Sequence, residues 1–168
     1  MSDLVTVILA AGKGTRMKSS LPKVLHRVGG KSMLQHVLDA ASKAGAKRNI
    51  VVVGFGGEQV KEAIGDQAEF VVQAEQLGTG HAVQQTASLL QGETGTVMVL
   101  CGDTPLLTGE LLKKLYDAHK EAGAKATVLT AIMPDATGYG RIIRTATGTV
   151  EKIVEHKDAT EAERKVQE

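Results

Sequence analysis

The sequence is poor in cysteine and in aromatic residues. It contains one cysteine, Cys101, so no disulfide bond can form within the chain, which fits a reducing compartment. Tryptophan is absent and aromatic residues make up only 2% of the chain, whereas apolar residues make up 42%. The core must therefore be built from aliphatic side chains. A chain of 168 residues fits one domain and is long enough to bury such a core without disulfides.

The sequence also lacks an excess of charge and a long apolar run. Lysine and arginine number 20 and aspartate and glutamate 19, which argues against a protein that binds nucleic acid through a basic face. Any phosphate binding must come from a local arrangement of charge. The first apolar run, Val5–Ala11, is too short to cross a membrane, and no basic residue precedes it. We expect a cytoplasmic protein with neither a membrane nor a nucleic-acid partner.

Short apolar runs alternate with helical patterns along most of the chain. Strands are expected at Val5–Ala11, Ile50–Val53, Phe70–Val72, Thr96–Cys101 and Ala126–Ile132. Helices are expected at Met33–Ala44, Gln59–Ile64, Thr79–Leu90 and Gly109–Glu121, the last with Thr108 as N-cap and with Leu111, Leu112, Leu115 and Ala118 facing the sheet. This alternation predicts an α/β fold, a Rossmann-like and mainly parallel sheet flanked by helices on both faces. Such sheets bind ligands at the carboxyl ends of their strands.

The pattern changes near the C-terminal end of the sequence. Tyr139–Arg144 and Thr149–Val154 alternate like strands around a turn at Ala146–Gly148, which predicts a hairpin. The last stretch, Ala159–Glu168, is charged and favours helix. No linker or repeat separates these parts, so we interpret residues 1–168 as a single domain.

A glycine-rich loop follows the first strand and is the most informative segment. The sequence Gly12-Lys13-Gly14-Thr15-Arg16 would expose backbone N–H groups to a ligand, and Lys23 follows shortly after it. Backbone donors and three nearby cations suit a polyanion such as a nucleoside triphosphate. Arg16 offers a planar fork and Lys23 a compact charge. Alternatively, these cations are ordinary solvated residues of a connecting loop.

Two familiar phosphate-binding motifs do not fit this loop. Both the P-loop and the dinucleotide fingerprint require a glycine at the position that Met17 occupies when the motif begins at Gly12. No acidic residue stands about 20 residues further on to bind a ribose hydroxyl. The spacing therefore leaves a phosphate-binding loop of another kind.

Two further segments carry candidate ligands. Asp103 follows a buried strand and suits Mg²⁺ bound through one carboxylate and substrate phosphates, or else it begins a turn before Pro105. Cys101 is expected to pack as a small apolar residue. In Gln73–Ala82, amide side chains suit the reading of a base edge. His81 is interpreted as structural rather than as a catalytic base.

Six motifs, in this order, carry a family resemblance. They are LAAGKGTRM at Leu9–Met17, LPKVL at Leu21–Leu25, AEQLGTGHA at Ala74–Ala82, CGDTPLL at Cys101–Leu107, TGYGRI at Thr137–Ile142 and IVEHKDAT at Ile153–Thr160. The first two resemble the signature of the sugar-nucleotide pyrophosphorylases. Together they resemble the uridyltransferase domain of the bacterial bifunctional N-acetylglucosamine-1-phosphate uridyltransferase / glucosamine-1-phosphate acetyltransferases. The resemblance covers essentially the whole chain.

The resemblance implies roles for individual residues. Arg16 and Lys23 would be the catalytic residues that meet the phosphates, and Asp103 would bind Mg²⁺. The implied substrate contacts are Leu9, Ala10, Ala11, Gly12 and Lys23 along the nucleotide, Gln73 on uracil, Gly78 and Thr79 beside the nucleoside, Cys101, Gly102 and Asp103 on the ribose and metal side, and Gly140 and Glu155 on N-acetylglucosamine. Many relatives have a tyrosine in place of Cys101, a change that a backbone contact would tolerate.

The implied reaction joins UTP and N-acetylglucosamine 1-phosphate to give UDP-N-acetylglucosamine, a cell-wall precursor, and pyrophosphate. The family domain continues beyond Glu168 with an Asn-Thr-Gly block at the sugar and an asparagine that completes the metal site. The left-handed β-helix acetyltransferase domain, through which the parent protein would form a homotrimer, is also absent. We therefore expect an incomplete, C-terminally truncated nucleotidyltransferase domain. The alternatives are a pyrophosphorylase for another sugar nucleotide, a binding fragment without turnover, and a purely structural α/β fragment.

Overall fold

The computed structural model describes residues 3–168, so Met1 and Ser2 lie outside the described part of the chain. The chain divides into two compact units, Met1–Gly123 and Ala124–Glu168. Each unit is described by itself below. The single domain expected from the sequence stays a prediction.

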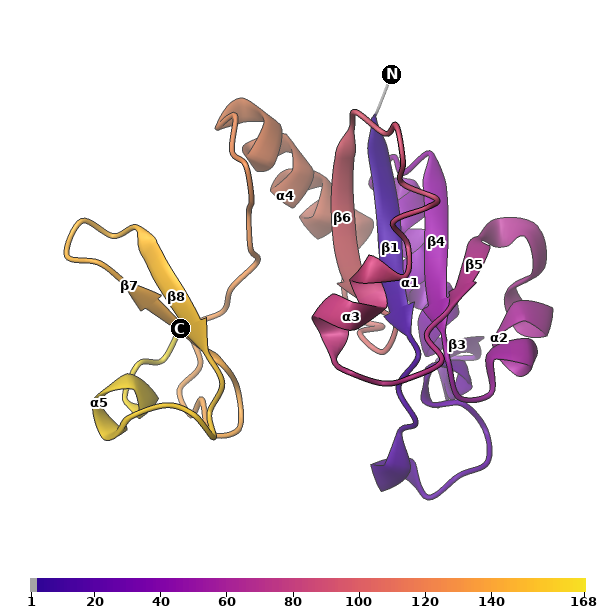
Figure 1. Cartoon of the computed structure of the whole chain (residues 1–168), viewed down its shortest axis with the longest axis horizontal. Coiled ribbons are helices and arrows are strands. Elements are labelled where there is room, and N and C mark those ends of the chain that lie inside the picture. Colours follow the sequence, from indigo (N-terminus) through magenta and orange to yellow (C-terminus); the bar gives the residue numbers. More distant parts are fainter. Residues whose placement is uncertain (1–2) are drawn as a thin grey trace. The chain divides into compact units, whose positions relative to one another are not determined.

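A parallel sheet forms the centre of the first unit (Figure 1). Its strand order is β5 (Glu69–Val72), β4 (Arg48–Val53), β1 (Leu4–Ala10) and β6 (Thr96–Cys101), with every neighbouring pair parallel. Strand β1 is central, and Val7 lies opposite both Ile50 and Val99. Because β1 is covered on both faces, its sequence is a continuous apolar run, interrupted only by the buried Thr6, rather than an alternating one. The predicted parallel sheet is confirmed.

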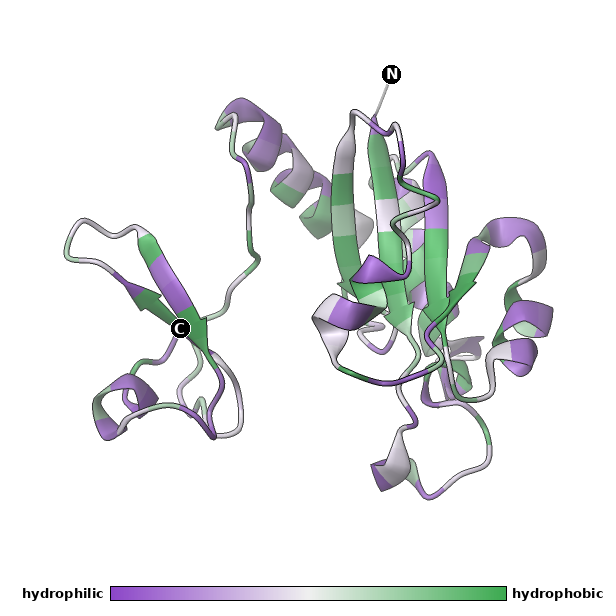
Figure 2. Ribbon diagram, in the orientation of Figure 1, coloured by the Kyte–Doolittle hydropathy of each residue, from purple (hydrophilic) through white to green (hydrophobic). Residues whose placement is uncertain are grey.

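Three helices cover one face of this sheet: α1 (Met33–Lys43), α2 (Gly57–Ile64) and α4 (Gly109–Glu121). They bury the larger of the two apolar clusters, to which β1 contributes Leu4, Ile8 and Ala10. Figure 2 shows that the strands of this sheet are largely hydrophobic. Thr108 caps α4 as predicted, since its side chain accepts a hydrogen bond from the Leu111 backbone N–H. Leu112 is buried, but Leu111 and Ala118 point to solvent, so the expectation that both face the sheet was wrong.

The opposite face carries α3 (Thr79–Gln84), whose Ala82 packs on Val5, Val7, Ile50 and Val52. The predicted helix to Leu90 is too long. After Gln84 the backbone bonds of the next residues reach three residues back rather than four, a tighter winding that ends regular α-helix. The hydroxyl of Thr86 also donates to the Val83 carbonyl at 2.7 Å, which competes with helical bonding.

Smaller elements connect these layers. A short antiparallel pair, β2 (Arg27–Val28) and β3 (Lys31–Ser32), leads into α1, which Ser32 caps. Single 3-10 turns lie at Thr15–Met17, Lys23–Leu25 and Gly65–Gln67. In residues 3–168 no helix has both the length and the apolar character needed to span a membrane.

The second unit is built on the predicted hairpin. Strands β7 (Arg141–Arg144) and β8 (Val150–Val154) pair antiparallel, and α5 (Glu161–Arg164) follows with a capping box at Thr160. Arg141, the first residue of β7, is buried and donates to the backbone carbonyls of Tyr139 and Arg164.

The strand predicted at Ala126–Ile132 does not form. A strand requires a neighbour for its backbone groups, and none of the strands β1 to β8 pairs with this segment. Its apolar side chains stay exposed, Ile132 by 70%. The β-branched and apolar pattern alone gave the wrong structure here.

Candidate functional site

The loops that leave β1 and β6 border a pocket of about 680 Å³ in the first unit, within the usual ligand-site range of about 300–1,000 Å³. Both loops leave the carboxyl ends of their strands, the edge where parallel sheets bind ligands. Most of the predicted nucleotide residues line it: Leu9, Ala10, Ala11, Gly12, Arg16, Lys23, Gln73, Gly78, Thr79, Cys101 and Asp103.

The two glycines of the loop have different roles: Gly14 allows the loop to fold, and Gly12 leaves space for a ligand. Gly14 has a positive φ of 59°, and a Cβ at this position would lie 2.7 Å from Cβ of Lys23. Glycine there is needed to fold the loop against Lys23. At Gly12, by contrast, no atom lies within 4 Å of an added Cβ and φ is not positive. The open space at Gly12 belongs to the pocket.

An ion pair between Lys23 Nζ and Asp103 Oδ2 occupies one side of the pocket. Gly102 positions Asp103, because its backbone N–H donates to the Leu9 carbonyl at 2.9 Å and so continues the β1–β6 pairing past the end of β6. Gly102 itself is buried and does not line the pocket. A Cβ there would lie 3.0 Å from the Leu9 oxygen, so glycine is needed for this close approach.

Asp103 fits a hard divalent cation that takes its other ligands from substrate and water. It is the carboxylate that lines the pocket, and within residues 3–168 no cluster of three or more His, Cys, Asp or Glu residues is placed to hold a metal. One carboxylate with substrate phosphates is a common arrangement for Mg²⁺. The role of Asp103 as a metal ligand stays a prediction.

Cys101 differs from its expected packing. It lines the pocket as an exposed free cysteine and joins neither apolar cluster. Partial burial raises the pKa of its thiol, and the nearby Asp103 carboxylate raises it further, while Lys23 opposes the change. A thiol that stays protonated is a weak nucleophile, so these contacts give Cys101 no catalytic character.

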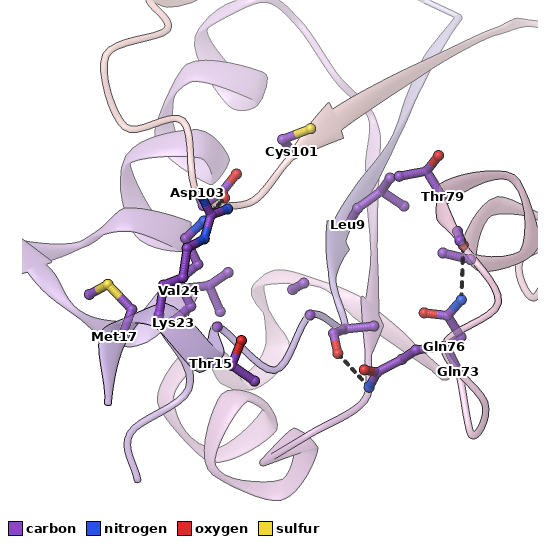
Figure 3. A pocket seen from close by; sticks show the side chains of 17 residues that line it. Leu9, Thr15, Met17, Lys23, Val24, Gln73, Gln76, Thr79, Cys101 and Asp103 are labelled. Atoms are coloured by element: carbon purple, nitrogen blue, oxygen red, sulfur yellow. Dashed lines mark hydrogen bonds and ion pairs between the residues drawn. The ribbon is translucent and has the colours of Figure 1, made fainter. Parts of the chain in front are cut away.

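Amide side chains form the other side of the pocket (Figure 3). Gln73 follows β5, and its backbone N–H donates to the Val53 carbonyl at 2.8 Å. The Gln76 side chain donates to the Ala11 carbonyl at 2.9 Å and thereby ties this segment to the glycine loop. Figure 3 shows Lys23 and Asp103 on one side, Gln73, Gln76 and Thr79 on the other, and Leu9 between them.

The pocket and the predicted site do not coincide in full. Some residues line the pocket without a predicted role, and two predicted residues belong to the second unit. Met17, Val24 and Ala82 line it without an expected ligand contact, whereas Gly14, Thr15 and Gln76 were expected there only as parts of the glycine loop and of the amide segment. Gly140 and Glu155 belong to the second unit, where a Cβ on Gly140 would lie 4.0 Å from Glu155 Oε2. They therefore neighbour one another, and their role at a sugar stays a prediction.

Comparison with known proteins agrees with this geometry. Residues 6–156 match the family MobA-like NTP transferase domain. The chain belongs to this family. It is thus a nucleotidyltransferase by family, with its phosphate-binding candidates gathered at one sheet edge.

Curated relatives extend well beyond the chain. Bifunctional protein GlmU of Geobacillus thermodenitrificans is 62% identical over 162 residues, which are 96% of this chain and 35% of that protein. Bifunctional protein GlmU of Bacillus cereus (strain AH187) is 59% identical over 168 residues, which are 100% of this chain and 37% of that protein. The chain therefore spans little more than a third of these relatives and matches their N-terminal part.

Solved structures share the fold at low sequence identity. UDP-glucose pyrophosphorylase from Acinetobacter baumanii has a TM-score of 0.74 and 21% identity, over 93% of this chain and 68% of that one. Rv0371c from Mycobacterium tuberculosis H37Rv has a TM-score of 0.62 and 23% identity, over 71% and 62%. The predicted fold, of the nucleotide-diphospho-sugar transferase type, is confirmed.

Proposed function

We propose that the chain carries the nucleotidyl-transfer site of an enzyme that makes UDP-N-acetylglucosamine and pyrophosphate from UTP and N-acetylglucosamine 1-phosphate. The pocket carries the proposal, because it joins a glycine loop, the cations Arg16 and Lys23, the carboxylate of Asp103 and the amide of Gln73. These groups suit a triphosphate, a divalent cation and a base. The motifs of the sequence and its 62% identity to Bifunctional protein GlmU support this choice of substrates.

In the proposed reaction, a phosphate oxygen of the sugar phosphate forms a bond to the α-phosphorus of UTP. The bond from that phosphorus to the bridging oxygen breaks, and pyrophosphate leaves. The nucleophile is already an anion, so no general base is required. Catalysis then depends on positioning and on stabilising negative charge. Arg16 and Lys23 are the residues proposed to offset charge on the α-phosphate and on the departing pyrophosphate.

Mg²⁺ is the proposed cofactor, with Asp103 as its protein ligand in the first unit. When bound, the ion would supply charge neutralisation at the phosphate oxygens. The protein's part is to release Asp103 from Lys23 so that each can meet the substrate. A structural neighbour, Rv0371C of Mycobacterium tuberculosis H37Rv, is described as a complex with manganese, which makes a divalent metal plausible in this fold.

A second candidate is a nucleotide-binding module without turnover. The chain spans 35–37% of the GlmU relatives, so residues outside it could complete the sugar or metal site. The homotrimer, the cytoplasmic location and the cell-wall role expected from the sequence stay predictions under either candidate.

Calorimetric titration and a pyrophosphate-release assay test the two candidates. We expect UTP and UDP-N-acetylglucosamine to bind at submillimolar concentration, with UTP binding dependent on Mg²⁺. Release of pyrophosphate from UTP and N-acetylglucosamine 1-phosphate supports the enzyme, and binding without release supports the module. Absence of binding at millimolar ligand contradicts both. Lys47→Ala, which changes a cation outside the pocket, serves as the control for a general charge effect.

A further inference from the structure

The carbonyl group that precedes the glycine loop is held by a side chain rather than by the sheet. Strand β1 ends at Ala10, and within residues 3–168 no backbone N–H donates to the carbonyl oxygen of Ala11. Gln76 supplies the donor instead, because its Nε2 lies 2.9 Å from that oxygen (Figure 3). Ala11 is only 5% exposed, so water has little access to its backbone and the carbonyl depends on this bond.

Gly54 leaves room for this orientation of the carbonyl. A Cβ built on Gly54 would lie 2.7 Å from the oxygen of Ala11 and 3.1 Å from its Cβ. Gly54 directly follows β4, which is the neighbour of β1 in the sheet, so the Ala11 oxygen lies close both to the end of β4 and to Gln76. The absence of a side chain at Gly54 and the donor of Gln76 therefore favour the same direction of the carbonyl.

The direction of this carbonyl sets the direction of the Gly12 N–H. Both groups belong to one planar trans peptide unit, in which the C=O and the N–H point in opposite directions. The carbonyl faces Gln76 on the amide side of the pocket, so the Gly12 N–H points away from that side, where Figure 3 shows Lys23 and Asp103 opposite Gln76. Gly12 lines the pocket, and within residues 3–168 no acceptor pairs with its N–H. This donor is therefore left for a ligand.

We propose that Gln76 is a positioning residue that holds the peptide unit between Ala11 and Gly12 in the orientation that offers the Gly12 N–H to a phosphate of the nucleotide. Rotation of this unit would put a carbonyl oxygen in place of the N–H, and an oxygen with partial negative charge repels a phosphate. Gln76 thus acts on the phosphates through the backbone and not on the base. This inference deepens the proposed function and rests on it.

Gln76→Met tests this role, because methionine has a similar size and no charge but cannot donate a hydrogen bond. We expect the affinity for UTP, measured by calorimetry, to fall about tenfold, the effect of one well-placed hydrogen bond. The affinity for uridine, measured by NMR titration, should change by less than about twofold, because uridine has no phosphate. Gln67→Met is the matched control. Gln67 also donates its amide to a backbone carbonyl, that of Ile64 at 3.1 Å, but it lies outside the pocket, so both affinities should stay unchanged.

A double substitution tests whether Gln76 acts through Gly12. In Gly12→Ala the added methyl group would stand in the open space of the pocket and keep a phosphate away from this N–H. Adding Gln76→Met to that variant should therefore lower the UTP affinity by less than about twofold further, whereas two independent losses would multiply. Uridine affinity should again stay near the wild-type value.

The outcomes separate this inference from the proposed function. Wild-type protein that binds no UTP overturns the proposed function and this inference together. If the wild type binds UTP, an unchanged UTP affinity in Gln76→Met overturns this inference alone. So do equal losses for UTP and uridine in that variant, which would mark a contact with the base or a general structural role, and so do losses that multiply in the double variant.

Discussion

Lys23 and Asp103, 80 residues apart in the sequence, form an ion pair inside the pocket. The side chains are 34% and 31% exposed. An ion pair with this much solvent contact contributes about 0–1 kcal/mol to stability. Without a ligand, a cation suited to phosphate and a carboxylate suited to a metal neutralise each other. A substrate that brings both phosphate and metal offers each residue a new partner at small cost.

The first prediction concerns Lys23→Ala. We expect the free energy of unfolding to change by less than about 1 kcal/mol, because the broken ion pair is partly exposed. Turnover should fall about 10²–10³-fold, the effect of removing one group that stabilises transition-state charge. Urea unfolding and pyrophosphate release measure the two effects. Where the wild-type chain shows binding without turnover, weaker UTP binding replaces the kinetic readout.

Lys61 provides the matched control for this substitution. It is also 34% exposed and also pairs with a carboxylate, Glu58, but it lies on α2 outside the pocket. Lys61→Ala should match Lys23→Ala in stability and leave UTP binding and turnover unchanged. Equal losses of function in the two variants would remove Lys23 from the phosphate site.

Gly12→Ala is expected to weaken ligand binding without destabilising the fold. The structure has room for the methyl group and requires no positive φ at Gly12, so the unfolding free energy should not decrease. The methyl group would enter the pocket and block close approach of a phosphate to the loop backbone, so UTP affinity should fall at least about tenfold, or 1.4 kcal/mol. Thermal unfolding and calorimetry of the same samples give both quantities.

Gly80→Ala is the control for Gly12→Ala. Gly80 also has space around it and no positive φ, but it lies in α3 and does not line the pocket. Alanine there should stabilise the helix by up to about 1 kcal/mol and leave UTP affinity unchanged. Retained affinity in Gly12→Ala would mean that the ligand does not approach this part of the loop.

The sequence predicted elements that depend on neighbouring residues better than elements that depend on a distant partner. The runs at β1, β4 and β6 and the cap of α4 depend on residues close in sequence, and their positions agree within a few residues. The error at Ala126–Ile132 has a different origin, because pairing depends on a partner that the segment itself does not specify. The early end of α3 depends on the Thr86 hydroxyl, a weak signal against an otherwise helical pattern.

In the candidate site, too, features set by neighbouring residues were predictable and contacts between distant residues were not. The sequence placed the residues beside the glycine loop at the pocket because strand, loop and charge are contiguous in the sequence, and their roles stay predictions. Gln76 was expected only as one of the amides suited to a base edge. Its contact with the glycine loop was not predicted, because it depends on a hydrogen bond to Ala11, 65 residues away. The Lys23–Asp103 ion pair was missed for the same reason, since each residue had been assigned to a ligand rather than to the other.

Arg141→Met should destabilise the second unit. The buried guanidinium donates to the Tyr139 and Arg164 carbonyls and lies 3.5 Å from His156 Nδ1. Methionine fills similar space but leaves these acceptors without donors, at an expected cost of about 1–3 kcal/mol. Hydrogen exchange of the β7 and β8 amides measures this cost.

Arg144→Met is the control. Arg144 lies in the same hairpin, is 41% exposed and pairs with Glu168, so its loss should cost less than about 1 kcal/mol. Equal costs would contradict the buried role of Arg141.

The last prediction concerns the acid sensitivity of α5. A hydrogen bond from Lys152, followed by bonds from Thr160 in the capping box, lowers the pKa of Glu163 from 4.5 to about 2. Because the pKa is lower in the folded than in the unfolded state, the carboxylate stabilises α5 fully above pH 4.5. This contribution is lost as the pH falls from 4.5 to about 2. A carboxyl NMR titration should show the low pKa, and the α5 amides should lose protection over the same range.

Two substitutions rank the causes of this shift. Lys152→Met removes the largest contribution to the shift, so it should raise the pKa of Glu163 more than Thr160→Val does. In the valine variant, the backbone N–H of residue 160 can still donate to Glu163, a bond of 2.8 Å in the wild type. In both variants the loss should still begin near pH 4.5, but it should be complete at a higher pH than in the wild type and should be smaller in total, since the interval between the folded and unfolded pKa values narrows. A wild-type pKa near 4.5 would mean that the capping box does not hold in solution. The reverse order of the two variants would identify the cap, rather than the lysine, as the main stabiliser of the carboxylate.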